Sequence, residues 1–153
     1  MSIKVVVDRT LPAEQQLLLK MVCALVDDLI LSDGSSVMLM TSPDTLSIRA
    51  ASGDISEPLE NKIGITLKIG ERVAGRCAQD KKPILVTGDV AKDGRFGNLT
   101  RYQNINSGLS VPIIKNGKVL GVINAKRTKN PDPLAEKDLQ TVEIIAGNLA
   151  KVL

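Results

Sequence analysis

Histidine and tryptophan are absent from this sequence of 153 residues, and phenylalanine and tyrosine occur once each. Without histidine, the chain lacks the commonest general base and cannot form the Ser-His or Cys-His pair that activates a nucleophile. Histidine ligation of haem and histidine-containing zinc sites are excluded for the same reason. We therefore expect no catalytic residues, no cofactor and no metal site.

Cysteine is also scarce, since Cys23 and Cys77 are the two in the chain. They are far apart and lie in helical patterns with apolar neighbours, so packing is the simplest role for them. No apolar run approaches the roughly 20 residues that a transmembrane helix needs, and the N-terminus has no secretory signal pattern. We expect a cytoplasmic protein, because a reducing compartment suits two unpaired cysteines.

The charge balance points to no polyanionic partner. The net charge is only +3, and the basic residues are scattered in short groups. Neither a helix-turn-helix nor the aromatic motif of an RNA-binding sheet is present, so we expect neither nucleic acid nor membrane as a partner. A composition of 43% hydrophobic and 24% charged residues is that of a globular protein, and the length suits one domain over residues 1–153.

The pattern of residues 11–31 predicts a helix, with Thr10 as its N-cap and Pro12 in its first turn. Its apolar residues form two stripes. The first stripe contains Leu18, Val22, Leu25 and Leu29, and the second contains Leu17, Met21, Ala24 and Leu31. A helix that packs on one surface needs one stripe only, so we expect the second stripe to meet a partner subunit in a homodimer.

The last element is predicted to be a helix with Asp132 as N-cap and Pro133 at its first position. One apolar stripe follows this helix: Leu139, Val142, Ile145, Leu149 and Val152. We expect the leading and closing helices to be buried together in the dimer. The candidate interface residues are Leu17, Met21, Ala24, Leu31, Val142 and Leu149.

The region between the two helices is predicted to be mainly antiparallel sheet. After Gly34 the apolar period changes to two, and Leu46, Ile48 and Ala50 alternate with polar residues after a turn at Pro43. A second hairpin has Asn116-Gly117 at its turn, the strongest short-range hairpin signal, because a type I′ turn needs positive φ at both central residues. Residues 70–80 form a short amphipathic helix and residues 84–86 a short strand. The order of elements predicts an α+β fold.

Several segments of this sequence together form a pattern known from one protein family: Leu67 to Gly75, Lys82 to Val86, Asp89-Val90, Asp93 to Phe96, Ser110 to Ile114 and Gly117 to Asn124. In their order and spacing these segments resemble the GAF family of small-molecule-sensing regulatory domains. The resemblance extends from about residue 35 to residue 153. It implies a central antiparallel sheet with the terminal helices packed on one face and loops and short helices covering the other.

In the GAF family, the loop that here contains the two aromatic residues covers a ligand pocket on the sheet. Phe96 or Tyr102 could stack on a planar ligand while Arg95 pairs with its anionic group. Alternatively, Phe96 pins the loop to the core and Arg95 lies in solvent. Asp89 could contact the ligand or cap a turn. The floor of the pocket would be formed by Met38, Met40, Ser110 and Asn124, which could equally be ordinary core residues.

The resemblance implies a sensory or regulatory domain that binds a small cytosolic ligand and signals through its terminal helices to an attached or separate output domain. A GAF scaffold without a ligand, used for dimerisation or docking, is the alternative. A third interpretation is a thiol-dependent free methionine sulfoxide reductase, although such enzymes use a set of loop cysteines and this chain has only two. The segment from Gly70 to Cys77 imitates a phosphate-binding loop, but Arg76 and Cys77 replace its Lys and Ser or Thr.

Overall fold

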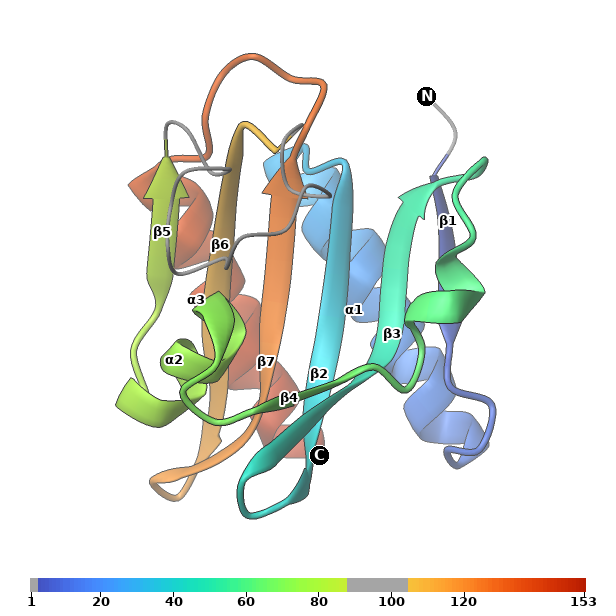
Figure 1. Cartoon of the computed structure of the whole chain (residues 1–153), viewed down its shortest axis with the longest axis vertical. Helices are drawn as coiled ribbons and strands as arrows, with labels where there is room; N and C mark the ends of the chain where they lie inside the picture. The colour runs from blue at the N-terminus through green and yellow to red at the C-terminus, as the bar shows by residue number, and fades with distance from the viewer. Residues whose placement is uncertain (1–2, 88–104) are drawn as a thin grey trace.

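The computed structural model describes residues 3–87 and 105–153. A seven-stranded sheet has two long helices on one face and short elements on the other (Figure 1). The strands are β1 (Ile3–Val7), β2 (Gly34–Ser42), β3 (Thr45–Asp54), β4 (Thr66–Lys68), β5 (Ile84–Thr87), β6 (Ser107–Lys115) and β7 (Lys118–Arg127). The helices are α1 (Ala13–Ile30), α2 (Arg72–Asp80) and α3 (Glu136–Val152), with a 3₁₀ turn η1 (Leu59–Lys62).

The strand order is β1-β3-β2-β7-β6-β5, with β4 paired to β3, and the pairs are antiparallel. The hairpins β2–β3 and β6–β7 therefore meet at the central pair β2–β7. In the turn of the second hairpin, Asn116 has φ of 53° and Gly117 has φ of 76°, the two positive values that the sequence predicts there. The expected α+β architecture, with the terminal helices on one face of an antiparallel sheet, is confirmed.

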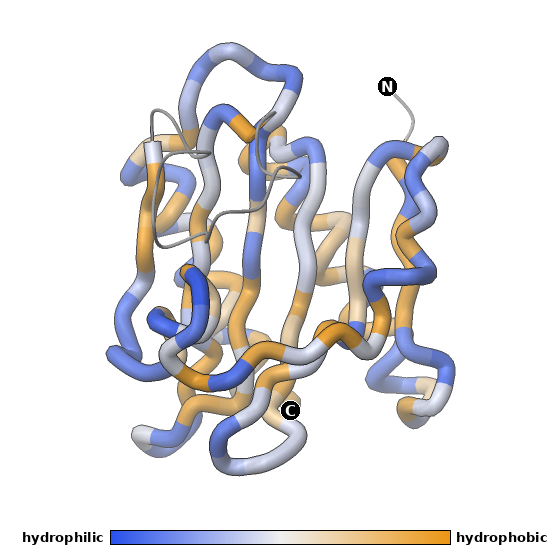
Figure 2. The backbone as a smooth tube through the Cα atoms, viewed as in Figure 1, coloured by the Kyte–Doolittle hydropathy of each residue, from blue (hydrophilic) through white to orange (hydrophobic). Residues whose placement is uncertain are grey.

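The main core lies between the sheet and the two long helices. Helix α1 packs against β1, β2 and β3, whereas α3 packs against β6 and β7. Among the buried residues of this core are Leu19, Val26, Ile30, Val37, Ile123, Val142 and Leu149. Figure 2 shows hydrophobic colours in the first half of β7 and hydrophilic colours in its second half, so the apolar interior gives way to polar residues along this strand.

The alternation in β3 predicts Leu46, Ile48 and Ala50 on one face, and this is wrong at Ala50. Val37 pairs with Ala50 and Met38 pairs with Ile48, so Arg49 is the extra residue of a β-bulge. The bulge turns Ala50 to the helix-covered face, where it joins the main core. Local alternation cannot predict this change of face, because the partner strand determines the bulge.

The predicted first cap is wrong, because α1 begins at Ala13 and its N-cap is Pro12. The Thr10 hydroxyl instead donates to Asp8 Oδ1 at 2.7 Å, in a turn that precedes the helix. Asp8 also pairs with Arg49 at 2.5 Å. The chain entering α1 is thus fixed to the bulge of β3 rather than by a cap at Thr10.

The predicted start of α3 is also wrong, since the helix begins at Glu136 and not at Pro133. The Ala135 amide at its N-terminus donates to Asp138 Oδ2 at 2.8 Å. The carbonyls of Asp132 and Pro133 accept hydrogen bonds from Arg127 Nη1 at 2.9 and 3.3 Å, which holds these residues outside the helix. A tertiary contact from β7 therefore overrides the local helix-start signal.

Candidate functional site

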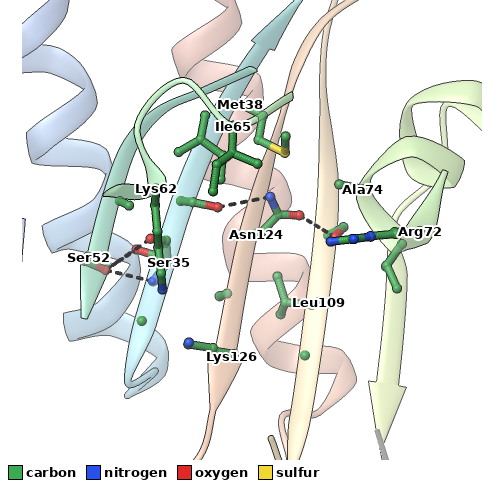
Figure 3. A pocket seen from close by; sticks show the side chains of 18 of the residues that line it. Ser35, Met38, Ser52, Lys62, Ile65, Arg72, Ala74, Leu109, Asn124 and Lys126 are labelled. Carbon is green, nitrogen blue, oxygen red and sulfur yellow. Dashed lines mark hydrogen bonds between the residues drawn. The ribbon is translucent and has the colours of Figure 1, made fainter. Parts of the chain in front are cut away.

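A cavity of about 400 Å³ lies on the face of the sheet opposite α1 and α3. Its floor is formed by β2, β3, β6 and β7, and its walls come from η1, β4 and α2 (Figure 3). The apolar side chains that line it are Met38, Ile48, Ile65, Leu67, Val73, Ala74, Ile105 and Leu109. This volume lies in the range typical of small-molecule sites, in which mostly apolar walls surround a few polar groups.

The centre of the floor carries a row of polar groups across three strands. Ser110 Oγ on β6 donates to Asn124 Oδ1 on β7 at 2.6 Å, and Asn124 Nδ2 donates to Ser36 Oγ on β2 at 3.1 Å. Figure 3 shows the row between the apolar side chains. Because these strands pair side by side, the row fixes the Asn124 amide in one orientation. It offers an ordered set of hydrogen-bonding groups to anything that enters the cavity.

Two lysines, Lys62 and Lys126, line the cavity near each other. Lys126 follows Asn124 by two residues on β7 and faces the cavity with it, because side chains alternate along a strand. Lys62 comes from η1, and its Nζ lies 3.5 Å from Glu57 Oε2. Burial lowers the pKa of Lys126 below its ordinary value, and the positive charge of Lys62 lowers it further. This part of the cavity thus carries a pair of like charges.

A third cation, Arg72, reaches the cavity from α2 on the side opposite Lys62 (Figure 3). Its backbone has φ of 54°, a left-handed conformation that costs a non-glycine residue about 1–3 kcal/mol. Gly75 in the same helix lies so close to β4 that an added Cβ would be 2.6 Å from the Lys68 carbonyl oxygen. The glycines at 70 and 75 therefore form a close strand-to-helix turn, and the resemblance to a phosphate-binding loop is rejected.

A buried hydrogen-bond network connects the cavity with α1. Ser35 and Ser52 line the cavity, and their hydroxyl oxygens lie 2.9 Å apart. Ser52 Oγ donates to Asp27 Oδ2, while Ser32 Oγ donates to Asp27 Oδ1 at 2.6 Å. Burial raises the pKa of Asp27, and the hydrogen bonds from the serines oppose this rise. A carboxyl group on α1 is thus joined through two serines to β2 and β3, the strands whose other face forms part of the cavity floor.

The structure brings some of the predicted site residues together and separates one of them. Met38, Ser110 and Asn124 line the cavity, as expected of a pocket floor. Met40 does not, because it lies in a second hollow near the hairpin turns, where Lys81 and Lys118 also lie. The remaining candidates fall outside the described residues: Asp89, Arg95, Phe96 and Tyr102.

Comparison with protein families finds a match to the GAF domain over residues 13–153. The chain belongs to the GAF domain family. No curated protein matches its sequence. Solved structures that it is similar to include the GAF domain of an Acinetobacter phosphoenolpyruvate-protein phosphotransferase, with 22% identity, a TM-score of 0.73 and coverage of 88% of this chain and 78% of that one.

Two further structures extend the comparison. The nlh2 GAF domain of A. aeolicus in an inactive state has 21% identity, a TM-score of 0.68 and coverage of 92% and 84% of the two chains. A type II free methionine-R-sulfoxide reductase from Thermoplasma acidophilum has 15% identity, a TM-score of 0.67 and coverage of 85% of each chain. At such identities the likeness concerns the GAF fold, which regulatory domains and an enzyme share.

The cysteines of this GAF domain are poorly placed for thiol chemistry. Cys23 and Cys77 are both fully buried and unpaired. The pKa of each thiol is raised to about 12, mainly by burial and to a lesser extent by a nearby aspartate. Since the thiolate is the reactive form, neither cysteine is activated. Among residues 3–87 and 105–153, no cluster of His, Cys, Asp or Glu could hold a metal ion.

The outer face of α1 differs from the predicted stripes. The stripe that faces the core consists of Leu19, Val22, Cys23, Val26 and Ile30. Apolar residues left exposed on or beside α1 are Leu17, Met21, Leu25, Leu29 and Leu31, with exposed fractions of 46–64%. Val142 and Leu149 of α3 are buried in the core, so the prediction that they line an interface is wrong. None of the helices in the described part of the chain is long and apolar enough to cross a membrane.

Four residues of the cavity lining were not predicted from the sequence: Lys62, Lys126, Ser35 and Ser52. Lys126 could have been found, because it shares a face of its strand with the predicted floor residue Asn124. Lys62 had no such signal, since its short helical turn carries no periodicity. Ser35 and Ser52 meet only because β2 pairs with β3, with Ser35 and Ser36 next to Ala51 and Ser52 in the ladder. Their contact depends on tertiary structure.

Proposed function

We propose that this GAF domain is a sensory module that binds a small molecule in the 400 Å³ cavity and transmits its occupancy to the terminal helices. The observation that carries the proposal is the combination of an apolar cavity with a polar floor and a hydrogen-bond network that joins two of the floor strands to α1. Apolar walls supply binding free energy, whereas a few oriented polar groups supply specificity. A sensory module needs a cavity to bind the ligand and a connection that transmits the binding to a distant surface.

Two connections favour α1 and α3 as the receiving elements. The first is the hydrogen bond that Ser52, on the helix-covered face of the floor strand β3, donates to Asp27 of α1. The second is strand β7, where Lys126 faces the cavity and the next residue, Arg127, faces the helices. Arg127 Nη2 donates to the Ile30 carbonyl at the end of α1 at 2.8 Å, and Nη1 donates to the Asp132 carbonyl before α3. A shift of β7 would therefore act on both helices.

The binding proposal is tested with a panel of metabolites and nucleotides by thermal unfolding. A compound at about 100 times its dissociation constant adds roughly 2.7 kcal/mol of stability, which is a clear increase in Tm. Asn124→Leu, which removes the central polar group of the floor, should abolish the increase for the same compound. Ser56→Ala, at an exposed position outside the cavity, is the control.

A panel in which no compound stabilises the domain would contradict the sensory proposal. It would favour the alternative, a GAF scaffold used for dimerisation or docking. The reductase interpretation receives no support from the buried, unactivated cysteines, so we propose a regulatory role without catalysis. We also propose a cytoplasmic location, with an attached or separate output domain as the recipient of the signal and no nucleic-acid or membrane partner.

The exposed apolar face of α1 supports a homodimer as the signalling unit. Leu17, Met21 and Leu25 recur at four-residue spacing, so they form one continuous strip beside Ala24. A second copy can cover such a strip through the same strip of its own, as a two-fold interface requires. Because the strip lies on the helix that contains Asp27, a change in the cavity would reach the interface directly.

The dimer is tested by sedimentation of the purified chain at micromolar concentration. We expect a dimer, and Met21→Lys should shift it to the monomer mass without lowering the Tm of the monomer, because the Met21 side chain is 59% exposed. Ile55→Lys places the same charge at an exposed isoleucine outside α1 and should leave the dimer intact. A wild-type chain that sediments as a monomer would overturn the proposal.

A further inference from the structure

We infer that the molecule bound in the cavity carries a carboxylate or phosphate group, and that this oxyanion binds between Lys62 and Lys126. The inference rests on the proposed function, since it assigns the class of ligand for the same cavity. The remainder of the ligand would be apolar, because the walls beyond the two lysines are formed by side chains such as Ile48, Ile65 and Leu67.

The charge balance of the cavity is the first argument. Of the described residues that line it, Lys62, Arg72 and Lys126 are cationic and Glu57 is the acidic one. Glu57 is already committed to Lys62, with 3.5 Å between Oε2 and Nζ. The lining therefore has an excess of positive charge, which an entering anion would balance.

The position of Lys126 is the second argument. Its side chain crosses the backbone of β2 at Gly34, where an added Cβ would lie 3.0 Å from Lys126 Cε. The absence of a side chain at Gly34 thus lets the methylene groups of Lys126 pack against β2 while its Nζ belongs to the cavity. A lysine at a solvent-facing position needs no such space.

The partners of Lys126 supply the third argument. In residues 3–87 and 105–153, no carboxylate lies within ion-pair distance of its Nζ. Asp33 is near, but its Oδ2 accepts the backbone amides of Thr128 and Lys129, at 2.5 and 2.8 Å. A cation removed from water without a counter-charge costs free energy, and the cost is recovered when an anion binds.

An anion at this position would also change the protonation of Lys126. The charged and titratable groups that act on its ammonium are Lys62 from η1, Glu57 before η1 and Asp33 before β2. Burial and Lys62 lower the pKa of Lys126, and a bound oxyanion would raise it again. Binding should therefore take up a proton, and the affinity should increase as the pH falls through the lowered pKa.

The polar floor complements this arrangement. Ser36 Oγ accepts from Asn124 Nδ2, which leaves its own hydroxyl hydrogen available, and Arg72 enters from the opposite side. A ligand whose oxyanion contacts Lys62 and Lys126 could thus extend across the floor with an apolar body and end at a hydrogen-bonding group. The expected class is a small amphiphilic acid, such as a carboxylic acid or a phosphate monoester.

The experiment compares charged and neutral probes of one shape by calorimetry, with hexanoate against hexanamide and inorganic phosphate as the bare oxyanion. Charge-assisted hydrogen bonds contribute about 1.5–3 kcal/mol, so hexanoate should bind roughly 10- to 100-fold more tightly than hexanamide. Lys126→Met, which keeps an unbranched apolar side chain but removes the ammonium group, should remove this preference and preserve or raise Tm. Lys118→Met, at an exposed lysine outside the cavity, is the matched control.

Calorimetry in two buffers of different ionisation enthalpy, between about pH 7 and pH 10, measures proton uptake. We expect uptake in the wild type and none in Lys126→Met; Lys126→Gln serves if the methionine variant fails to fold. Equal binding of hexanoate and hexanamide, or unchanged binding in Lys126→Met, would overturn the anion site. If neutral compounds of the broad panel stabilise the domain while no anion binds, the anion site fails and the sensory proposal stands. If nothing binds, both fail.

Discussion

The two faces of the sheet are built in different ways. The face under α1 and α3 has one continuous core that includes Leu19, Val26, Ile123 and Val142, all fully buried. The opposite face has two smaller apolar clusters, around Met38 and Val86, together with the cavity and its cations. One sheet thus presents close-packed side chains on one side and a partly hollow, polar surface on the other.

This difference separates stability from recognition. Close packing provides most of the free energy of folding, whereas an open cavity leaves apolar surface and charge without protein partners. The domain can remain folded with a cavity on one face of the sheet because the other face is closely packed against the helices. Substitutions should therefore change the unfolding free energy mainly on the helix-covered face and ligand affinity mainly on the cavity face.

The largest expected effect on the unfolding free energy comes from replacing a leucine by alanine, once on each face of the sheet. Leu19→Ala, in the closed core, should lower the unfolding free energy by about 2–5 kcal/mol. Leu67→Ala should cost less than about half as much, because Leu67 is only partly buried and lines an existing cavity. Urea unfolding of both variants measures the difference. Equal losses would break the contrast between the faces.

A smaller effect is expected where the floor strand β3 is connected to α1. Ser52→Ala removes the hydroxyl that donates to Asp27 and leaves a buried carboxyl group with one donor fewer. The loss should be about 1–3 kcal/mol, measured by the same urea unfolding. Ser56→Ala, at an exposed serine a few residues away, should change stability by less than about 0.5 kcal/mol. If Ser52→Ala is as neutral as Ser56→Ala, the network does not couple β3 to α1.

The pH dependence of stability should identify Asp27 on the helix-covered face. Because its folded pKa is raised above 3.8, its contribution is fully present below pH 3.8 and is lost as the pH rises through the folded pKa. The wild type should therefore gain stability relative to Asp27→Asn as the pH falls from neutrality toward 3.8. Asp8, Asp33 and Asp54, whose pKa values are lowered, act in the opposite sense in both proteins and cancel. A pH-independent difference would contradict this assignment.

The smallest expected effect is an absence of reaction at the thiols. Cys23 lies in the closed core and Cys77 beneath the cavity face, and both have a pKa of about 12. A thiol reagent at pH 8 should modify the native domain roughly a thousandfold more slowly than the unfolded chain, since the thiolate fraction is that much smaller. Fast labelling of Cys77 alone would show that the cavity face opens, and it would revive the reductase interpretation.

Local signals predicted much of the fold. The Asn116-Gly117 turn and the short helix of residues 72–80 follow from chain geometry that acts over a few residues. The start of α3 and the face of Ala50 could not be predicted, because Arg127 and the pairing with β2 determine them from a distance. Strand β1 was also missed, since its row of valines has no alternation and pairs with the distant β3.

The candidate site was predictable only in part. Met38, Ser110 and Asn124 were expected on the floor because strand alternation and the family resemblance place them there. The helix stripes were misassigned, because Leu18 and Leu19 are both apolar and periodicity alone does not decide which of them faces the sheet. Lys62 has no local pattern at all. Charged groups that act together across a cavity become visible only when the chain is folded.

The central pair β2–β7 has a consequence for the order of assembly. It joins two hairpins whose partners, such as Ser36 and Asn124, are separated by almost the whole middle of the chain. Each hairpin can form early through local contacts, whereas their junction must wait for closure of a long loop. The cavity floor takes residues from both hairpins, so it comes into existence only at this late step. A ligand that binds there would slow the separation of the hairpins. Only the fully folded domain would bind the ligand, because the same contacts between the hairpins complete the fold and form the cavity floor.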